Sequence, residues 1–123
     1  MKSFFRKLGV VTAAATLAAT VLVAAPAQAS GYGVGWYGVW AYGVNVRADQ
    51  SEQCYDFPGP LRCPRIVTTV SAPQQVYLTC QKAGETVGGN PYWVFMNMPG
   101  FTGWMASYYT NNATDWIDGL PVC

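Results

Sequence analysis

The side chains in this 123-residue sequence with the clearest capacity for chemistry are its carboxylates, and no histidine accompanies them. A glycosidase needs two carboxyl groups facing each other across a cleft, and Asp49 with Asp56 is one conceivable pair. Solvated loop acids are the commoner interpretation of such residues. Without histidine, no side chain has an ordinary pKa suited to acid–base catalysis near neutral pH. We therefore expect a protein that is not an enzyme. The acids are Asp49, Glu52, Asp56, Glu85, Asp115 and Asp118.

The cysteines, at positions 54, 63, 80 and 123, are the second reactive set. An even number in a short exported chain indicates two disulfides, for which three connectivities exist. Cys54 and Cys63 bracket the turn-forming stretch Pro58-Gly59-Pro60. A Cys80–Cys123 bond would fasten the end of the sequence to a predicted strand. The spacing thus favours Cys54–Cys63 and Cys80–Cys123, which would leave no free thiol. With neither histidine nor a Cys-x-x-Cys pair, we expect no metal and no cofactor.

The first 29 residues have the layout of a secretory signal peptide. Lys2, Arg6 and Lys7 precede the uncharged run 8–23, and Ala27-Gln28-Ala29 resembles a cleavage site. A retained anchor is the alternative, because the run approaches the ~18–20 residues of a membrane span. Its Ala- and Thr-rich composition favours cleavage after Ala29. We expect a secreted protein, extracellular or cell-wall associated, that does not contact the membrane after cleavage.

The 94 residues that would remain form one small domain with four basic and six acidic residues. This net charge of −2 lacks the basic footprint of a nucleic-acid-binding protein. A chain of this length buries a small core, which makes two disulfides a large part of its stability. We expect it to be a monomer.

Outside the signal peptide, no window has the apolar period of a helix, and short strand patterns recur between turns. Residues 30–37 form a leader rich in Gly and aromatic residues, and 49–64 form a long loop. Gly84 and the segment 88–91 are expected in loops, and 107–109 in a turn. About five strands predict an all-β fold, a small barrel or sandwich. The expected strands are residues 39–46, 66–70, 75–80, 92–98 and 102–106.

Gly38-Val39 stands ahead of Val44-Asn45-Val46-Arg47, and Trp93 and Gly103-Trp104-Met105 follow in later strands. In this order the motifs resemble the opening and the later strands of the bacterial SH3 domain family, and most closely its small exported versions in actinobacteria. The similarity extends over about residues 38–109. It implies an SH3-like barrel over 38–123. Cys80-Gln81-Lys82, followed by Gly88-Gly89-Asn90 and Cys123, resembles an actinobacterial subgroup, which implies the same Cys80–Cys123 pairing. The chain departs from the family in Arg47-Ala48-Asp49-Gln50 and in the inserted segment between Cys54 and Cys63.

Five Trp and eight Tyr in so small a domain favour a binding function, because these rings offer an apolar face and a donor. Trp93 and Trp104 are equally well explained as core residues. Arg47 is able to bind a ligand carboxylate, although a bond to Asp49 or to a loop carbonyl is the commoner role. The candidate ligand-binding residues are Tyr42, Arg47, Tyr55, Trp93, Trp104, Tyr108 and Tyr109.

The resemblance implies a non-catalytic module that binds peptidoglycan, its peptide stems or cross-bridges, in an aromatic groove. We expect this groove between the Cys54–Cys63 loop and the loop 84–90. The alternative is a secreted protein-binding or enzyme-inhibitor protein, since a small disulfide-closed domain presents a rigid loop. A small hydrolase is the third and least supported hypothesis.

Overall fold

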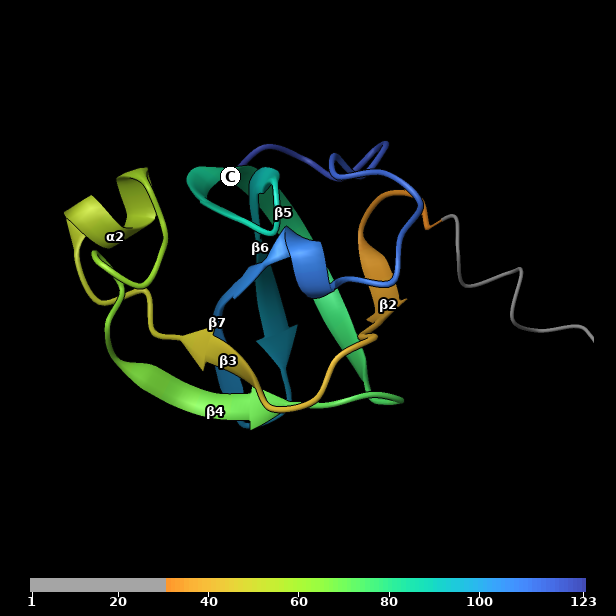
Figure 1. Cartoon of the computed structure of the whole chain (residues 1–123), viewed down its shortest axis with the longest axis horizontal. Helices are drawn as coiled ribbons and strands as arrows, with labels where there is room; N and C mark the ends of the chain where they lie inside the picture. Colours follow the sequence, from red (N-terminus) through yellow and green to blue (C-terminus); the bar gives the residue numbers. More distant parts are fainter. Residues whose placement is uncertain (1–30) are drawn as a thin grey trace, which may run out of the picture.

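The computed structural model describes residues 31–123, so the predicted signal peptide lies outside the described part. Residues 31–123 form one antiparallel sheet, curled into a half-barrel, with little helix (Figure 1). The predicted β architecture is confirmed, with six strands instead of about five. No helix within residues 31–123 is long and apolar enough to cross a membrane.

The order of the strands across the sheet is β2-β5-β6-β7-β3-β4. A short α-helix, α2 (Glu52–Asp56), and a 3₁₀ helix, η2 (Ser107–Tyr109), complete the elements. After η2, a bridge between Thr110 and Val39 returns the chain to the end of β2. The strands are β2 (Gly35–Gly38), β3 (Val44–Arg47), β4 (Ile66–Val70), β5 (Gln75–Val87), β6 (Asn90–Met98) and β7 (Phe101–Ala106).

Strand β5 runs seven residues beyond the predicted strand 75–80 and includes Gly84, which was expected in a loop. The missing side chain explains this position. A Cβ on Gly84 would collide with the carbonyl oxygen of Pro58 and the ring of Trp93. Glycine inside a strand marks such a close approach of another backbone. The turn itself lies at Gly88 and Gly89, whose φ angles of 57° and 82° suit a two-residue hairpin.

Part of the segment 30–37, expected to be a leader, belongs to the sheet. Strand β2 pairs with β5, with Trp36 opposite Tyr77. The predicted strand 39–46 is shorter than expected, because β3 begins only at Val44. The Tyr37 ring is buried in the core, and its hydroxyl donates to the Gly33 carbonyl at 2.6 Å. Burial raises the pKa of Tyr37 above its ordinary value. The sequence pattern did not indicate strand β2, because the segment is rich in glycine and its partner strand lies about 40 residues further along the chain.

The side chains of the central strands alternate between two cores on opposite faces of the sheet. In β6, Val94 belongs to the larger core and Trp93 to the smaller; in β7, Met105 and Trp104 divide in the same way. The smaller core contains the sulfurs of one disulfide. Its members are Cys54, Cys63, Trp93, Trp104 and Ala106. The larger core is formed by Tyr37, Val39, Val44, Val46, Val70, Val76, Leu78, Val94, Met96, Met105, Ile117 and Leu120.

Both predicted disulfides are present, Cys54–Cys63 and Cys80–Cys123, each with its Cα atoms 5.0 Å apart. The second one joins β5 to a C-terminal tail, residues 110–123, which supplies Ile117 and Leu120 to the larger core. Gln81 of β5 pairs in parallel with Val122 of the tail. The tail is therefore an integral part of the fold rather than a loose end.

The predicted loop 49–64 contains helix α2, which the sequence pattern did not indicate. Ser51 caps this helix, because its hydroxyl accepts from the Cys54 amide at 3.1 Å. One buried residue, Cys54, attaches the helix to the sheet. A helix of five residues has no amphipathic period to detect, so the cap was its main signal.

Candidate functional site

One pocket, with a volume of about 230 Å³, brings together residues from most parts of the fold. The β2–β3 connection, β3 and the disulfide loop between Cys54 and Cys63 form part of the wall. The end of β5, the central strands and η2 form the rest. The lining residues are Tyr42, Gly43, Val44, Asn45, Arg47, Pro60, Val87, Trp93, Ala106 and Tyr109.

Four of the seven predicted ligand-binding residues line this pocket: Tyr42, Arg47, Trp93 and Tyr109. Pro60 comes from the Cys54–Cys63 loop and Val87 from the segment 84–90, the two loops between which the groove was expected. Each of these two segments contributes one residue to the lining. That the pocket binds a ligand stays a prediction.

Arg47 is the only charged residue that lines the pocket. Its Nη1 donates to the carbonyl oxygen of Cys63 at 3.2 Å. Asp49, its alternative partner by sequence, instead accepts from the Trp104 indole at 3.1 Å. A guanidinium has five N–H donors, so one bond to a carbonyl leaves others for a ligand. The site therefore presents a cation without a lining carboxylate.

The two tryptophans are both core residues. Trp93 is 2% exposed, and its indole N–H donates to the Glu85 carbonyl at 2.7 Å, so it forms a fixed wall of the pocket. Trp104 has no exposed surface, lies outside the pocket and packs against Phe95, with ring centroids 5.0 Å apart. Trp104 therefore has no surface that a ligand could reach.

Tyr55 and Tyr108 are exposed but do not line the pocket. Tyr55 lies on α2, 41% exposed, with Nζ of Lys82 4.1 Å from its ring centre. Tyr108 is 36% exposed and packs edge-on against Trp40 at 5.3 Å. Tyr108 also contacts Tyr109, at 5.1 Å, and so borders the pocket indirectly.

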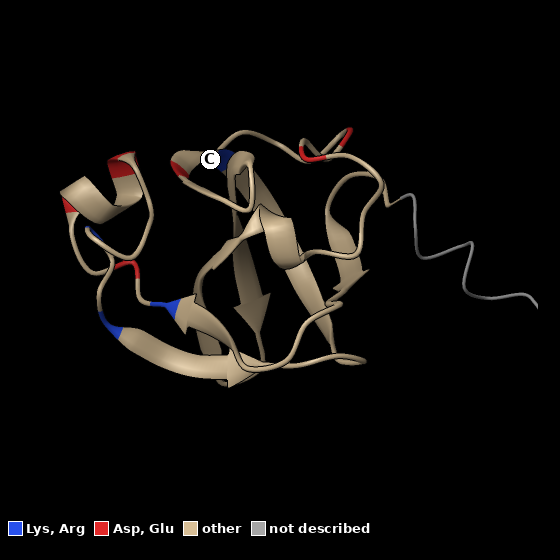
Figure 2. Ribbon diagram, viewed as in Figure 1, with Lys and Arg blue, Asp and Glu red and all other residues tan. Residues whose placement is uncertain are grey.

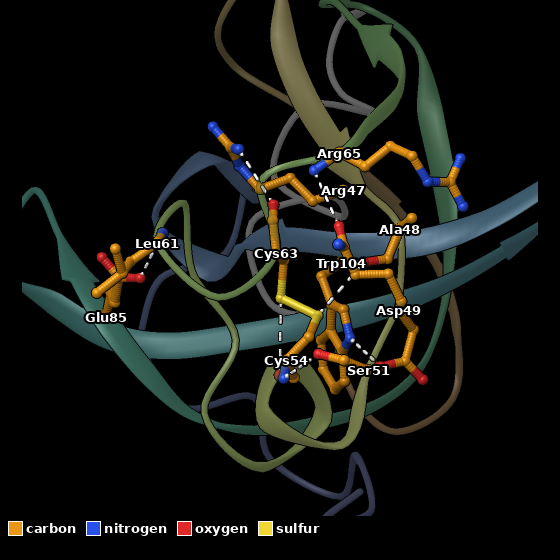
Figure 3. The surroundings of a disulfide bond; sticks show 11 residues. Arg47, Ala48, Asp49, Ser51, Cys54, Leu61, Cys63, Arg65, Glu85 and Trp104 are labelled. Atoms are coloured by element: carbon orange, nitrogen blue, oxygen red, sulfur yellow. Dashed lines mark hydrogen bonds between the residues drawn. A yellow bond between two sulfur atoms is a disulfide. The ribbon is translucent and has the colours of Figure 1, made fainter.

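The disulfide loop is tied to β5 and β3 by hydrogen bonds between its backbone and the side chains of Glu85 and Arg47 (Figure 3). The Glu85 carboxylate accepts from the Leu61 amide at 2.8 Å, and the Glu85 amide donates to the Pro58 carbonyl at 2.9 Å. Cys63, whose carbonyl holds Arg47, is fully buried. These bonds hold the wall that carries Pro60 against the sheet.

Charged residues are few, and both signs occur around the disulfide loop and on β5 (Figure 2). Basic positions lie at the end of β3, before the start of β4, in the disulfide loop and on β5, whereas α2 and the tail carry acids. The residues described here include no group of three or more His, Cys, Asp or Glu able to hold a metal ion. The pocket is suited to recognition of an anionic or neutral group.

Sequence reasoning missed several lining residues because they carry no functional signal of their own. Asn45 and Arg47 lie two residues apart on β3, so their side chains share a face, and this spacing could have added Asn45 to the candidates. Val87 and Ala106 are ordinary apolar residues whose proximity depends on sheet register. Trp40, beside Tyr108 and Tyr109, was likewise overlooked.

Comparisons of this chain with protein-family models, with curated proteins and with solved structures gave no match.

Proposed function

We propose that this chain is an exported, non-catalytic binding module with an SH3-like barrel, and that its ligand is a peptide of the bacterial cell wall. The N-terminal sequence supports export, and the two disulfides suit an oxidising compartment. On this proposal the mature protein is secreted or wall-associated and acts as a monomer.

The connectivity supports the SH3-like interpretation. Strands β5, β6 and β7 form a consecutive antiparallel meander, followed at once by the 3₁₀ helix η2. The chain then returns to the first strand through the Thr110–Val39 bridge, and the Asn111 amide donates to Gly38 at 2.8 Å. A short barrel in which a terminal segment pairs with the first strand has this arrangement.

The observation that carries the proposal is the pocket beside Arg47. It is walled by Tyr42, Trp93 and Tyr109 and closed on one side by Pro60 of the disulfide loop. Concave sites with apolar walls and a few convergent polar groups are the usual binding sites of proteins. Tyrosine and tryptophan walls suit peptides, since they give large contact areas at a small cost in side-chain entropy.

A sedimentation assay with purified cell-wall sacculi tests the proposal. The exported protein, purified with its disulfides formed, should co-sediment with sacculi above the level of bovine albumin. Tyr42→Ala should reduce the retained fraction, because Tyr42 lines the pocket and is 80% exposed, so its loss leaves the core intact. Trp36→Ala is the matched control, since Trp36 is 55% exposed on β2 and does not line the pocket. Retention no greater than that of albumin would contradict the proposal.

The disulfide loop favours a second candidate, an inhibitor or other protein-binding role. Leu61 is 79% exposed and Phe57 39% exposed on a segment closed by Cys54–Cys63 and hydrogen-bonded to Glu85. A rigid loop with exposed apolar side chains loses little entropy on binding another protein. Dose-dependent inhibition of secreted hydrolases that Leu61→Ser abolishes would favour this function over wall binding.

A further inference from the structure

We infer that the pocket receives the free carboxylate end of a peptide, which Arg47 binds while Tyr42 and Tyr109 contact the residue before it. This inference names the ligand group of the proposed binding site and therefore rests on the proposed function. Four observations lead to it: the charge of the lining, the anchoring of Arg47, the size of the pocket and the rigidity of its aromatic wall.

The charge of the lining selects an anion. Arg47 contributes the one formal charge, and the remaining lining residues are neutral. The carboxylates nearest in sequence to Arg47 and Val87 are already hydrogen-bonded, Asp49 to the Trp104 indole and Glu85 of β5 to the Leu61 amide. A planar guanidinium matches a carboxylate with two parallel N–H bonds, which gives orientation as well as attraction. A cationic peptide end would meet Arg47 as a like charge.

Arg47 is anchored before any ligand arrives. Its backbone lies in β3, where it faces Ile66 of β4 and Trp104 of β7. Its guanidinium is held by the carbonyl of Cys63, a residue that the disulfide fixes in the smaller core. Restricting an arginine in advance removes part of the entropy cost of binding.

The size of the pocket restricts the ligand to a small group. Its volume of about 230 Å³ lies below the roughly 300–1,000 Å³ of sites for drug-sized ligands. One or two small residues at a chain end fit such a volume, and a bulky group does not. Asn45 adds an amide beside Arg47 that is able to bond a peptide group.

The aromatic wall is held in place from behind. Tyr109 packs against Trp40 and Tyr108, with centroid distances of 5.7 Å and 5.1 Å. The Trp40 indole N–H donates to the Tyr108 carbonyl at 2.8 Å, which fixes the orientation of that ring. Tyr109 therefore presents a fixed surface to the residue that precedes the carboxylate.

The first experiment compares two ligands on the unmodified protein and needs no variant. N-acetyl-D-alanyl-D-alanine and its C-terminal amide are titrated separately into the exported protein and followed by ¹H–¹⁵N NMR. Hydrogen bonds to a charged group are worth more than neutral ones by enough to change affinity about tenfold. We expect the acid to bind about tenfold more tightly than the amide, with shifts at the Trp93 indole N–H. Equal affinities, or no binding of either at millimolar concentration, would overturn the inference.

Variants then locate the cation. Arg47→Gln should weaken binding of the dipeptide acid about tenfold and abolish its advantage over the amide. Arg47→Lys should recover only part of this affinity, because an ammonium group lacks the planar, two-pronged donor geometry of a guanidinium. Arg65→Gln is the matched control: it makes the same charge change, but Arg65 does not line the pocket and its side chain points away from Arg47 (Figure 3). Sodium acetate tests the carboxylate alone; if it bound as tightly as the dipeptide, the role of the aromatic wall would be refuted.

The two proposals fail in distinguishable ways. Retention on sacculi that is equal for Arg47→Gln and Arg65→Gln would overturn the carboxylate inference and leave wall binding standing. Absence of retention together with Arg47-dependent binding of the dipeptide acid would do the reverse. Retention that Arg47→Gln abolishes and the dipeptide acid competes away would support both.

Discussion

Replacing Gln81 by leucine should loosen the part of the C-terminal tail around Ile117 and Leu120. The Gln81 side chain is fully buried. Its Nε2 donates to the carbonyls of Ile117 at 2.7 Å and Leu120 at 3.0 Å, and its Oε1 accepts from the Ile117 amide at 2.9 Å. Leucine has similar bulk but satisfies none of these three backbone groups.

The magnitude follows from these bonds. At about 1 kcal/mol of net stability for each hydrogen bond, losing three costs about 3 kcal/mol. The loss in free energy of unfolding would be larger if Ile117 and Leu120 also left the larger core, since burying such a side chain is worth about 1.5–3 kcal/mol. The Cys80–Cys123 bond keeps the tail nearby in either case. We expect the free energy of unfolding to fall by about 3 kcal/mol.

Urea unfolding followed by tryptophan fluorescence measures this loss. Gln75→Leu is the control, because it makes the same change at an exposed position of the same strand and should alter stability by less than about 0.5 kcal/mol. Gln81→Glu should also be destabilised near neutral pH, since its charged carboxylate would face two carbonyl oxygens, and it should regain stability in acid as the proton returns. If Gln81→Leu unfolded at the same urea concentration as Gln75→Leu, the assignment of Gln81 as the tail anchor would be refuted.

Three further predictions concern the core and the disulfides. Desolvation raises the pKa of Tyr37 above its ordinary 10.0, so its contribution to stability is complete below about pH 10 and is lost as the pH rises through the folded-state pKa; Tyr37→Phe should flatten this decline in urea titrations at several pH values. Gly84→Ala, whose Cβ would collide with the Pro58 carbonyl, should cost about 1–3 kcal/mol; a cost no larger than that of Gly38→Ala, where a Cβ fits, would argue against close packing of the loop. Replacing both cysteines of a bond by alanine should lower the free energy of unfolding by about 3 kcal/mol for Cys54–Cys63 and about 4 kcal/mol for Cys80–Cys123, because of loop entropy. Only loss of the Cys54–Cys63 bond should weaken ligand binding. The reverse order of thermal stability would contradict the loop-length argument.

The features that sequence reasoning predicted correctly are those with local signals. The β-branched run 66–70 became β4 with the same bounds, and the apolar stretch 92–98 became most of β6. Both disulfide pairs followed from turn residues and from the need to fasten a tail. Four of the seven candidate ligand-binding residues line the pocket, and their binding role stays a prediction.

The features that it missed depend on contacts between distant segments. Strand β2 exists because β5 pairs with it, and Gly84 stays in a strand because the Pro58 backbone approaches closely. Whether Trp104 is in the core or at a surface depends on the disulfide loop covering it, which no alternation pattern reports.

The amino-acid sequence alone indicates a small β protein with two disulfide bonds and many aromatic rings, because strand period, turn residues and cysteine count can be recognised in short stretches of sequence. The position of Arg47 beside Tyr42, Trp93 and Tyr109 is different in kind: these residues are up to 67 positions apart and meet only through the register of β3, β6 and β7. A shift of one residue in any of these strands would turn its side chains to the opposite face. The pocket is therefore a property of the folded sheet.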